Sequence, residues 1–562
     1  MRRYSIYLNL FISMFFILGC GKEFLQKLPQ GQLSDDQLEN KEGVEGALLG
    51  AYSIMNGNVS GTWGNYASAP SQWLFGEVSS DNAHKGSEAP DQPAMMNIET
   101  YLATSVNDNL TAMWQVYFEG VLRCNNTIRM LNTDQSGKKS VSEARAKQIL
   151  GEVRLLRAHY YFFLWRIFRK LPVLNENTTN EEAISISNDQ DVLPSIEADM
   201  KFAAENLTKE KYNNEAGRFN VDAAKAYLGK FYLYQKKYTE ALALFKEVMA
   251  GKDIVDMPYW NNFDVTKENG PEAILVAKHG INKDGTGDNG NVGDMLSGIH
   301  NNSVVGCCGF YQPTFDLVNA YKVNQNGLPY LDGSYRTDPY MSDFNNPTYE
   351  LQVGISFDPR LDYNVGRKGV EYLDYGIMPG NTWIRQVSFG GPFVNIKTMI
   401  PRALFPSETV PGAPQVSGLD VNIIRLADVY LMAAECEVEL GNLANALKLV
   451  NDIRLRASKL PAKKTASGTP AANYVVNPYP NFTSQDQARA AVRFERRLEL
   501  AMEGHRFFDL VRWGIAKQVI ESYSAFEGGI ISSYKDLKFN PNNEYWPIPQ
   551  VELDRNPNLK QN

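Results

Sequence analysis

The chain has few of the residues from which metal-held and disulfide-held folds are built. It contains 5 cysteines and 5 histidines among 562 residues, with neither a CxxC pair nor an HExxH segment. So few cysteines exclude a disulfide scaffold for a chain of this length. A transition-metal site would need closely spaced Cys or His ligands. The sequence therefore predicts no metal site, no cofactor and no catalytic constellation.

Clusters of positive charge are also missing. The formal net charge is −8, and no basic block offsets it. Nucleic acids and anionic membrane surfaces attract proteins through dense Lys and Arg. We therefore expect no nucleic-acid partner.

Two of the cysteines, Cys307 and Cys308, are neighbours in the chain. Disulfide geometry requires a defined separation of the two Cα atoms, which adjacent residues reach only by distortion. We expect two free thiols, with a strained ring in an oxidising compartment as the alternative.

Long apolar runs are scarce as well, and the one that stands out covers residues 6–18. It is too short to span a bilayer and has the length of a signal-peptide core. An ordinary signal peptide ends in an Ala-x-Ala-like site, but the first alanine is Ala47. The run instead stops at Gly19-Cys20, which resembles a bacterial lipoprotein signal. We predict a signal peptide over 1–19 and lipidation of Cys20; cleavage by an ordinary secretory route near Gly19 is the alternative.

The remaining chain of about 540 residues exceeds the usual size of one core. After a polar tether over 20–39, apolar residues at helical spacing predict helices over 40–55, 109–132 and 142–169. Residues 61–81 are rich in Gly, Ser and aromatic residues. We interpret them as a loop that carries exposed rings.

A repeated pattern indicates the scaffold. Gly229, Tyr232, Ala241 and Phe245 have the spacing of a tetratricopeptide unit, and residues 425–454 carry a second copy. Small residues let paired helices approach, and the large ring fills the gap between them. We predict a fold dominated by α-helices, with a tetratricopeptide-type helical repeat scaffold. Two unrelated helical hairpins are the alternative.

Between the two copies the sequence changes character. Residues 255–415 are dense in Gly, Asn, Asp and Pro, with short β-like runs and little helical periodicity. Long loops of this kind are usually functional. We predict three regions: an N-terminal helical region over 40–254, a loop-rich ligand-binding insertion with short β-strands over 255–415, and a C-terminal helical region over 416–562.

The C-terminal region carries a long motif, ERRLEL at 495–500 followed by EGHRFFDLVRW at 503–513. This motif is similar to the signature of the RagB/SusD family of Bacteroidetes surface lipoproteins. Further segments occur in the order of that family: YQPT at 311–314, LVNAY at 317–321, FDPRL at 357–361, IRLADVYL at 424–431, NDIR at 451–454, WPIP at 546–549 and NPNL at 556–559. The resemblance covers essentially the whole chain after the signal.

The resemblance implies a tetratricopeptide-containing α fold whose loop-rich face binds glycan. It also implies a partner, a SusC-like TonB-dependent outer-membrane transporter that the lipoprotein covers like a lid. The protein would then be lipid-anchored in the outer membrane and face the cell exterior. Binding residues vary across the family and are not carried over from it.

Candidate binding residues come instead from chemistry. A sugar presents polar edges and apolar C–H faces, so its site needs exposed rings bordered by polar partners. For Trp73 and Phe75, which lie in an apolar run, a place in the core is the favoured alternative. Asp81 could equally cap a helix or turn. The candidates are Trp63, Tyr66, Trp73, Asp81, Asn82, Tyr259, Trp260, Phe310, Tyr311, Trp383 and Arg385.

Three functions remain open from sequence. The first is a non-catalytic glycan-binding lipoprotein that delivers oligo- or polysaccharide to the transporter. The second is a peptide-binding lipoprotein of the same architecture. The third is a glycoside hydrolase, which would need two carboxylates facing each other across a cleft; no motif picks out such a pair.

Overall fold

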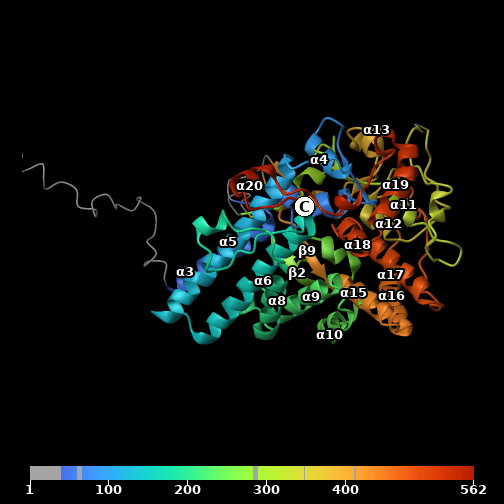
Figure 1. The fold of residues 1–562 in the computed structure, drawn as a ribbon. Coiled ribbons are helices and arrows are strands. Elements are labelled where there is room, and N and C mark those ends of the chain that lie inside the picture. Colours follow the sequence, from blue (N-terminus) through green and yellow to red (C-terminus); the bar gives the residue numbers. More distant parts are fainter. Residues whose placement is uncertain (1–39, 60–65, 283–288, 347, 411–412) are drawn as a thin grey trace, which may run out of the picture.

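The computed structural model describes residues 40–562 apart from 60–65, 283–288, 347 and 411–412 (Figure 1). Cys20 and Trp63 lie outside the described residues. Within the described part of the chain, the helices are all too short or too polar to cross a membrane.

The N-terminal half is built from long helices. These are α3 (Lys41–Tyr52), α5 (Asp108–Ser136), α6 (Glu143–Phe168) and α8 (Leu193–Asn206). They confirm the helices predicted from periodicity, and the start of α6 is fixed by the Ser142 side chain, which accepts a hydrogen bond from the backbone N–H of Arg145. The second half of α6 is buried on all sides, as expected for a helix at the centre of a core.

The two predicted repeat units are helical hairpins. The first consists of α9 (Val221–Tyr234) and α10 (Tyr238–Met249), the second of α15 (Leu426–Glu439) and α16 (Leu443–Ser458). A Cβ at Gly229 would lie 2.5 Å from the Phe245 ring, so the helices of the first hairpin approach as the small residue and large ring indicate. Because α10 packs against α15, the two hairpins join one row of helices that runs along one side of the molecule (Figure 1).

Short strands connect segments that are far apart in sequence. The strand β1 (Ala83–Gly86) pairs antiparallel with β3 (Phe310–Pro313), and β2 (Ala273–Ala277) pairs antiparallel with β9 (Val421–Arg425). The other pairs are β4 (Ser356–Phe357) with β10 (Asn473–Tyr474), β5 (Val365–Gly366) with β6 (Val394–Asn395), and β7 (Thr409–Val410) with β8 (Ala413–Ser417).

The remaining helices are mostly short. Their bounds are α4 (Pro93–Glu99), α7 (Asn180–Ala183), α11 (Phe315–Ala320), α12 (Leu361–Asn364), α13 (Val387–Gly390), α14 (Phe405–Glu408), α17 (Gln485–Glu499), α18 (Arg506–Arg512), α19 (Ala516–Ile530) and α20 (Gln550–Arg555). The helix α17 packs against α15 and α16. In Figure 1, α4, α11, α12 and α13 gather on the side opposite to the row of long helices. The fold is thus dominated by helices, as predicted. The region 255–415 carries short strands, as expected, but β1, β9 and β10 lie outside it.

Residues 66–81 differ from the exposed loop that we expected over 61–81. Residues Trp73–Val78 form a π-helical turn that is buried throughout. The indole N–H of Trp73 donates to the Gly293 carbonyl at 3.0 Å, and the Phe75 ring packs edge-on against Trp546. The core alternative is therefore correct for Trp73 and Phe75. The apolar run that contains Trp73 and Phe75 is buried even though the residues on either side of it are rich in Gly and Ser.

The C-terminal signature forms a buried network of ion pairs. The Glu499 carboxylate accepts from Arg360 at 3.0 Å and Arg425 at 2.8 Å, and also from Arg456. These four side chains are at most 2 % exposed. A structural role for this motif, locked by ion pairs, is confirmed. The partners come from distant segments: Arg496, which lies within reach of Glu499 on α17, instead pairs with Asp428 and Asp509.

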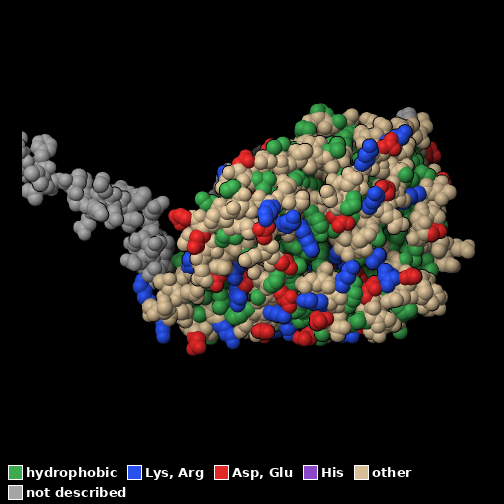
Figure 2. Space-filling model, in the orientation of Figure 1, with side chains coloured by type: hydrophobic (Ala, Val, Ile, Leu, Met, Phe, Trp, Pro, Cys, Tyr) green, Lys and Arg blue, Asp and Glu red, His purple; other side chains and the backbone are tan. Residues whose placement is uncertain are grey.

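On the surface, charges of both signs intermingle. Figure 2 shows one face of the molecule, on which Lys and Arg side chains alternate with Asp and Glu side chains over the helical side. Such mixed charge is typical of a solvated protein surface.

Candidate functional site

Most of the sequence-predicted binding residues lie inside the protein. Six of them are at most 2 % exposed: Trp73, Asp81, Asn82, Tyr259, Phe310 and Tyr311. The expectation that they are exposed is wrong, because their neighbours in space, which the sequence does not reveal, cover them. These six side chains therefore belong to the protein interior and do not line a binding surface.

Asp81 shows why a polar candidate is buried. Its carboxylate accepts two hydrogen bonds from Arg506, at 2.8 and 2.9 Å, and lies 3.1 Å from Arg497. Burial raises the pKa of Asp81, but the two guanidinium groups outweigh it and hold the pKa well below its usual range. Asn82 accepts from Arg497 at 2.8 Å. Both residues are therefore committed to structural pairs, and Asp81 does not act as a cap.

Tyr259 and Trp260 belong to a separate aromatic group. The Tyr259 hydroxyl donates to Asn364 at 2.7 Å, so the one polar atom of this buried side chain has a hydrogen-bond partner. The half-buried Trp260 ring packs against Phe263 and Tyr363, with centroids 5.8 and 6.1 Å away. Trp260 keeps an accessible edge, whereas Tyr259 has none.

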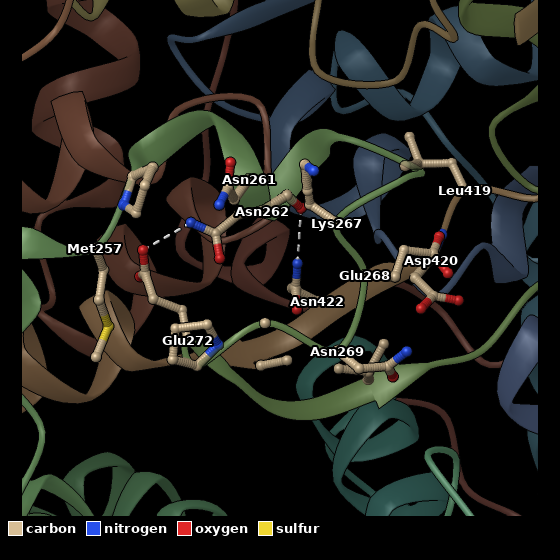
Figure 3. Close-up of a pocket in the computed structure, with 15 residues that line it drawn as sticks. Met257, Asn261, Asn262, Lys267, Glu268, Asn269, Glu272, Leu419, Asp420 and Asn422 are labelled. Carbon is tan, nitrogen blue, oxygen red and sulfur yellow. Dashed lines mark hydrogen bonds between the residues drawn. The ribbon is translucent and has the colours of Figure 1, made fainter.

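A small pocket beside this group is an unsuitable site for a sugar. It has a volume of about 30 Å³, enough for one or two water molecules (Figure 3). Its polar groups satisfy one another: Asn262 donates to Glu272 at 2.7 Å, and Asn422 donates to the Asn262 carbonyl at 3.0 Å. Burial and then the nearby Asp420 carboxylate raise the pKa of Glu268 above its ordinary value.

A wider cleft lies between α3 and the loop before α9. Its volume is about 450 Å³, and Tyr52, Arg218 and Lys278 are among its lining residues. The charged groups are paired within the protein: Arg218 contacts Glu215 at 2.7 Å, and Tyr52 donates to Glu152 at 2.7 Å. Tyr52 and Arg218 are thus already engaged within the protein.

Two of the remaining candidates, Trp383 and Arg385, lie in one of three loops that converge, and β1 and β3 bring the other two loops together. Gly86 lies opposite Phe310 in the strand pair, and the Ser87 N–H donates to the Gly309 carbonyl at 2.5 Å. A Cβ at Gly309 would lie 3.2 Å from that of His300, and its φ of +76° favours glycine. The loop after β1 therefore contacts the loop before β3.

The third loop, residues 381–386, is tied to both of the others. The His300 N–H donates to the Trp383 carbonyl at 3.2 Å, and the Ala89 N–H donates to the Gln386 side chain at 3.0 Å. This places Arg385, one of the predicted residues, between the first two loops.

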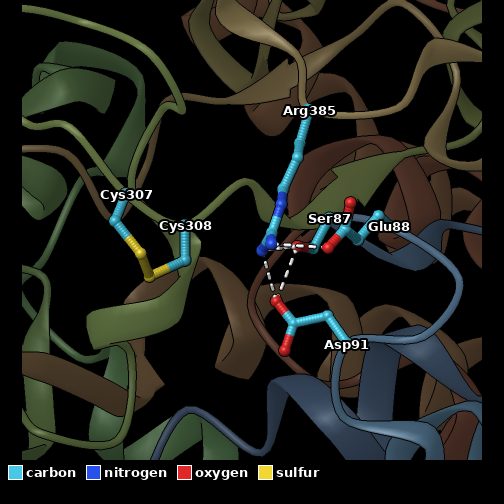
Figure 4. Close-up of a disulfide and its surroundings, with 6 residues drawn as sticks. All are labelled: Ser87, Glu88, Asp91, Cys307, Cys308 and Arg385. Carbon is cyan, nitrogen blue, oxygen red and sulfur yellow. Dashed lines mark hydrogen bonds and ion pairs between the residues drawn. A yellow bond between two sulfur atoms is a disulfide. The ribbon is translucent and has the colours of Figure 1, made fainter.

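Arg385 is the centre of an exposed polar cluster (Figure 4). Its guanidinium group donates to Ser87 at 3.1 Å, Asp91 at 2.6 Å and Glu88 at 2.5 Å. The three charged side chains retain 27–35 % of their exposure. Exposed ion pairs contribute only about 0–1 kcal/mol to stability, so the fold has little need of this one. Arg385, Glu88 and Asp91 do offer donors and acceptors at fixed positions on the surface, whereas Ser87 is buried and supports them from inside the protein.

Cys307 and Cys308 are joined by a disulfide beside this cluster, so the expectation of two free thiols is wrong. Gly306 and Gly309 flank the pair, and both have a positive φ. With glycine at both positions the backbone can turn sharply on either side of the cysteine pair. The expectation of free thiols, based on the usual Cα separation in disulfides, did not take such a turn into account. Cys307 is exposed and Cys308 is half-buried.

Aromatic and imidazole groups border the cluster. Tyr66 is half-buried, and burial followed by the Asp91 carboxylate raises the pKa of its hydroxyl. Burial and then the Arg385 charge lower the pKa of His300, so the imidazole is neutral at pH 7. Trp383 is 9 % exposed and packs edge-on against Tyr372, so it supports the loop that carries Arg385 from inside the protein. We call the group formed by Tyr66, Ser87, Glu88, Asp91, Arg385 and the Cys307–Cys308 disulfide the Arg385 site.

Sequence reasoning found Tyr66 and Arg385 but missed the other members. Ser87, Glu88 and Asp91 lie in an ordinary polar loop with no motif of its own. The signal that could have found them is the pairing of β1 with β3, which joins segments more than 200 residues apart.

Comparison with known proteins assigns the family. The model described as "SusD family" matches residues 271–562, more than half of the chain. The chain belongs to the SusD family. A second model, described as "Starch-binding associating with outer membrane", matches residues 23–233 of this SusD-family protein.

Relatives align over nearly the whole length. The SusD-like protein P25 of Formosa agariphila is 23 % identical, over 98 % of this chain and 97 % of its own. A SusD-like protein of Bacteroides ovatus is 22 % identical, over 88 % of this chain and 80 % of its own.

Solved structures share the fold. A laminarin-binding SusD-like protein has a TM-score of 0.65 at 24 % identity, and covers 93 % of this chain and 99 % of its own. Surface glycan-binding protein A from Bacteroides thetaiotaomicron, solved in complex with laminarihexaose, has a TM-score of 0.64 at 18 % identity with the same coverage.

Proposed function

We propose that this SusD-family protein captures glycan at the Arg385 site without cleaving it. The observation that supports this most is the Arg385 cluster, in which a guanidinium group forms ion pairs with two carboxylates and all three side chains are 27–35 % exposed. Sugar hydroxyls both donate and accept, so they match a surface that presents both kinds of group. Relatives of the same fold are named for binding laminarin or laminarihexaose.

The charges of the site favour a neutral glycan. Glu88 and Asp91 compensate the Arg385 charge, and His300 is neutral at pH 7. A carboxylate or sulfate on the sugar would meet Arg385 only in competition with these two carboxylates, at an exposed site where charge interactions are weak. Neutral β-glucan is therefore the first probe to use.

Two predicted residues remain proposed glycan contacts apart from the Arg385 site. Trp63 lies outside the described residues, and Trp260 is half-buried in its separate aromatic group. An indole stacked on a sugar C–H face would add apolar contact to the hydrogen bonds of a glycan site.

We further propose that lipid on Cys20 anchors the protein in the outer membrane, facing the exterior, beside a SusC-like TonB-dependent transporter that receives the glycan. Membership of the SusD family and the description of the second family model support this location. Replacement of Cys20 by Ser should release the protein from the membrane fraction while glycan affinity is unchanged. Retention of the Cys20→Ser variant in the membrane would contradict the anchor.

Affinity electrophoresis and calorimetry with laminarin, starch and an anionic polyuronate test the function. We expect retardation by a neutral glycan and no release of reducing ends during prolonged incubation. Newly released reducing ends would support a hydrolase instead. Binding of peptides in the absence of any glycan binding would favour the peptide-binding alternative.

A further inference from the structure

The Cys307–Cys308 disulfide has a position that stability does not explain. A disulfide stabilises a fold mainly by closing a loop in the unfolded chain, and the effect grows with loop length. Here the bonded residues are adjacent, so almost no loop is closed. The bridge therefore contributes little to global stability. Its consequences are local: it fixes the shape of the 306–309 turn, in which Cys307 is exposed and Cys308 half-buried.

The bridge lies next to the polar cluster of the site. Gly309 directly follows Cys308, and a Cβ on it would lie 4.0 Å from both the Arg385 Cβ and the Ser87 Cα. The Gly309 carbonyl also accepts from the Ser87 N–H. Figure 4 shows the disulfide with Arg385 and the carboxylates that hold it. Cys307, two residues before Gly309, is exposed, and the Arg385 side chain is 31 % exposed.

A sugar ring needs two kinds of contact, and the polar cluster supplies one of them. Its hydroxyl groups require hydrogen-bond partners, while its C–H faces require an apolar, polarizable surface. Phe310 and Tyr311, the rings that we expected near this place, are buried. Sulfur is soft and polarizable and is only weakly hydrated, so a disulfide with its two methylene groups can take the place of a ring.

We propose that the Cys307–Cys308 disulfide is a ligand-contact element of the Arg385 site, which packs against the C–H face of a bound sugar. This inference rests on the proposed glycan-binding function. Because the small ring formed by the bridge has few internal rotations, the contact surface is set before the ligand arrives, which lowers the entropic cost of binding.

The test uses the full chain carrying Cys20→Ser as the reference protein and laminarin as the probe. The bridge is removed in a Cys307→Ser/Cys308→Ser double variant, and Ser303→Ala, at an exposed position in the same loop, is the matched control. We expect the double variant to bind laminarin at least about 10-fold more weakly, with an unchanged melting temperature. The control should match the reference in both measurements.

Chemical reduction of the disulfide provides a second test if the double variant folds poorly. A dithiol reductant converts the exposed bridge of the reference protein to two thiols, while Cys124 and Cys436 are already free and buried. Thiol titration should then show two additional thiols, and laminarin affinity should fall and recover on reoxidation. Equal affinity of the oxidised, reduced and Ser-substituted proteins would overturn the role of the disulfide. A reference protein that binds no glycan in either redox state would instead overturn the proposed function itself.

Discussion

Two groups of arginine and carboxylate side chains in this protein have the same chemistry but different surroundings. Around Glu499, the arginines of three distant segments are at most 2 % exposed. Around Arg385, the paired side chains keep 27–35 % of their exposure. A buried ion pair is costly to break, whereas an exposed one contributes little. The Glu499 network can therefore hold the fold together, while the Arg385 site is free to exchange its partners for a ligand.

The largest effect is expected from Glu499→Gln. The substitution removes the buried carboxylate that Arg360, Arg425 and Arg456 share, so the charge balance of the whole network is disturbed although each arginine keeps another carboxylate partner. We expect the free energy of unfolding to fall by about 3–5 kcal/mol in urea titration. Glu521→Gln, at an exposed pair with Lys517, is the matched control and should change little. Equal losses in the two variants would mean that burial does not distinguish the two groups.

Trp73→Ala should be nearly as destabilising. The substitution removes a fully buried ring together with the hydrogen bond to Gly293, at a cost of about 3–5 kcal/mol. Thermal unfolding measures this loss. If Trp73→Ala weakened glycan binding at full stability, the place of this residue in the core would be contradicted.

A pH-dependent loss of stability is expected from His84. Its ring lies 3.1 Å from Glu99 and 2.9 Å from Glu527. Burial alone lowers the pKa of His84, but the hydrogen bonds to Glu527 and Glu99 outweigh it and raise the pKa to about 9. Because the pKa is higher in the folded state than the unperturbed value of about 6.5, the stabilisation is complete below pH ~6.5 and is lost as the pH rises through 9.

Urea titrations between pH 6 and pH 9.5 test this dependence. The free energy of unfolding should decline across that range for the unmodified residue and should decline less in a His84→Gln variant. Parallel curves for the two proteins would show that His84 is not the titrating group.

The same contrast explains how much the sequence predicts. Helical periodicity locates α5 and α6, and the spacing of Gly229 and Phe245 predicts the close approach of α9 and α10. These signals are local. The burial of Asp81 is not predictable, because it depends on Arg497 and Arg506, which are more than 400 residues away. The Arg385 site is hidden for the same reason, since strand pairing between β1 and β3 assembles it.

The Cys307–Cys308 disulfide shows a different limit. An argument from average disulfide geometry favoured free thiols, but the local path of the chain is set by Gly306 and Gly309. Average disulfide geometry predicts free thiols for adjacent cysteines and does not predict a turn in which the two cysteines are bonded.

Glycan affinity of an Arg385→Ala variant tests the central claim most directly. Arg555→Ala, which removes another exposed and paired arginine, is the matched control. We predict that Arg385→Ala binds laminarin at least about 10-fold more weakly while its melting temperature stays that of the parent, because the lost ion pairs are exposed. Unchanged laminarin affinity in the Arg385→Ala variant would contradict the assignment of this site.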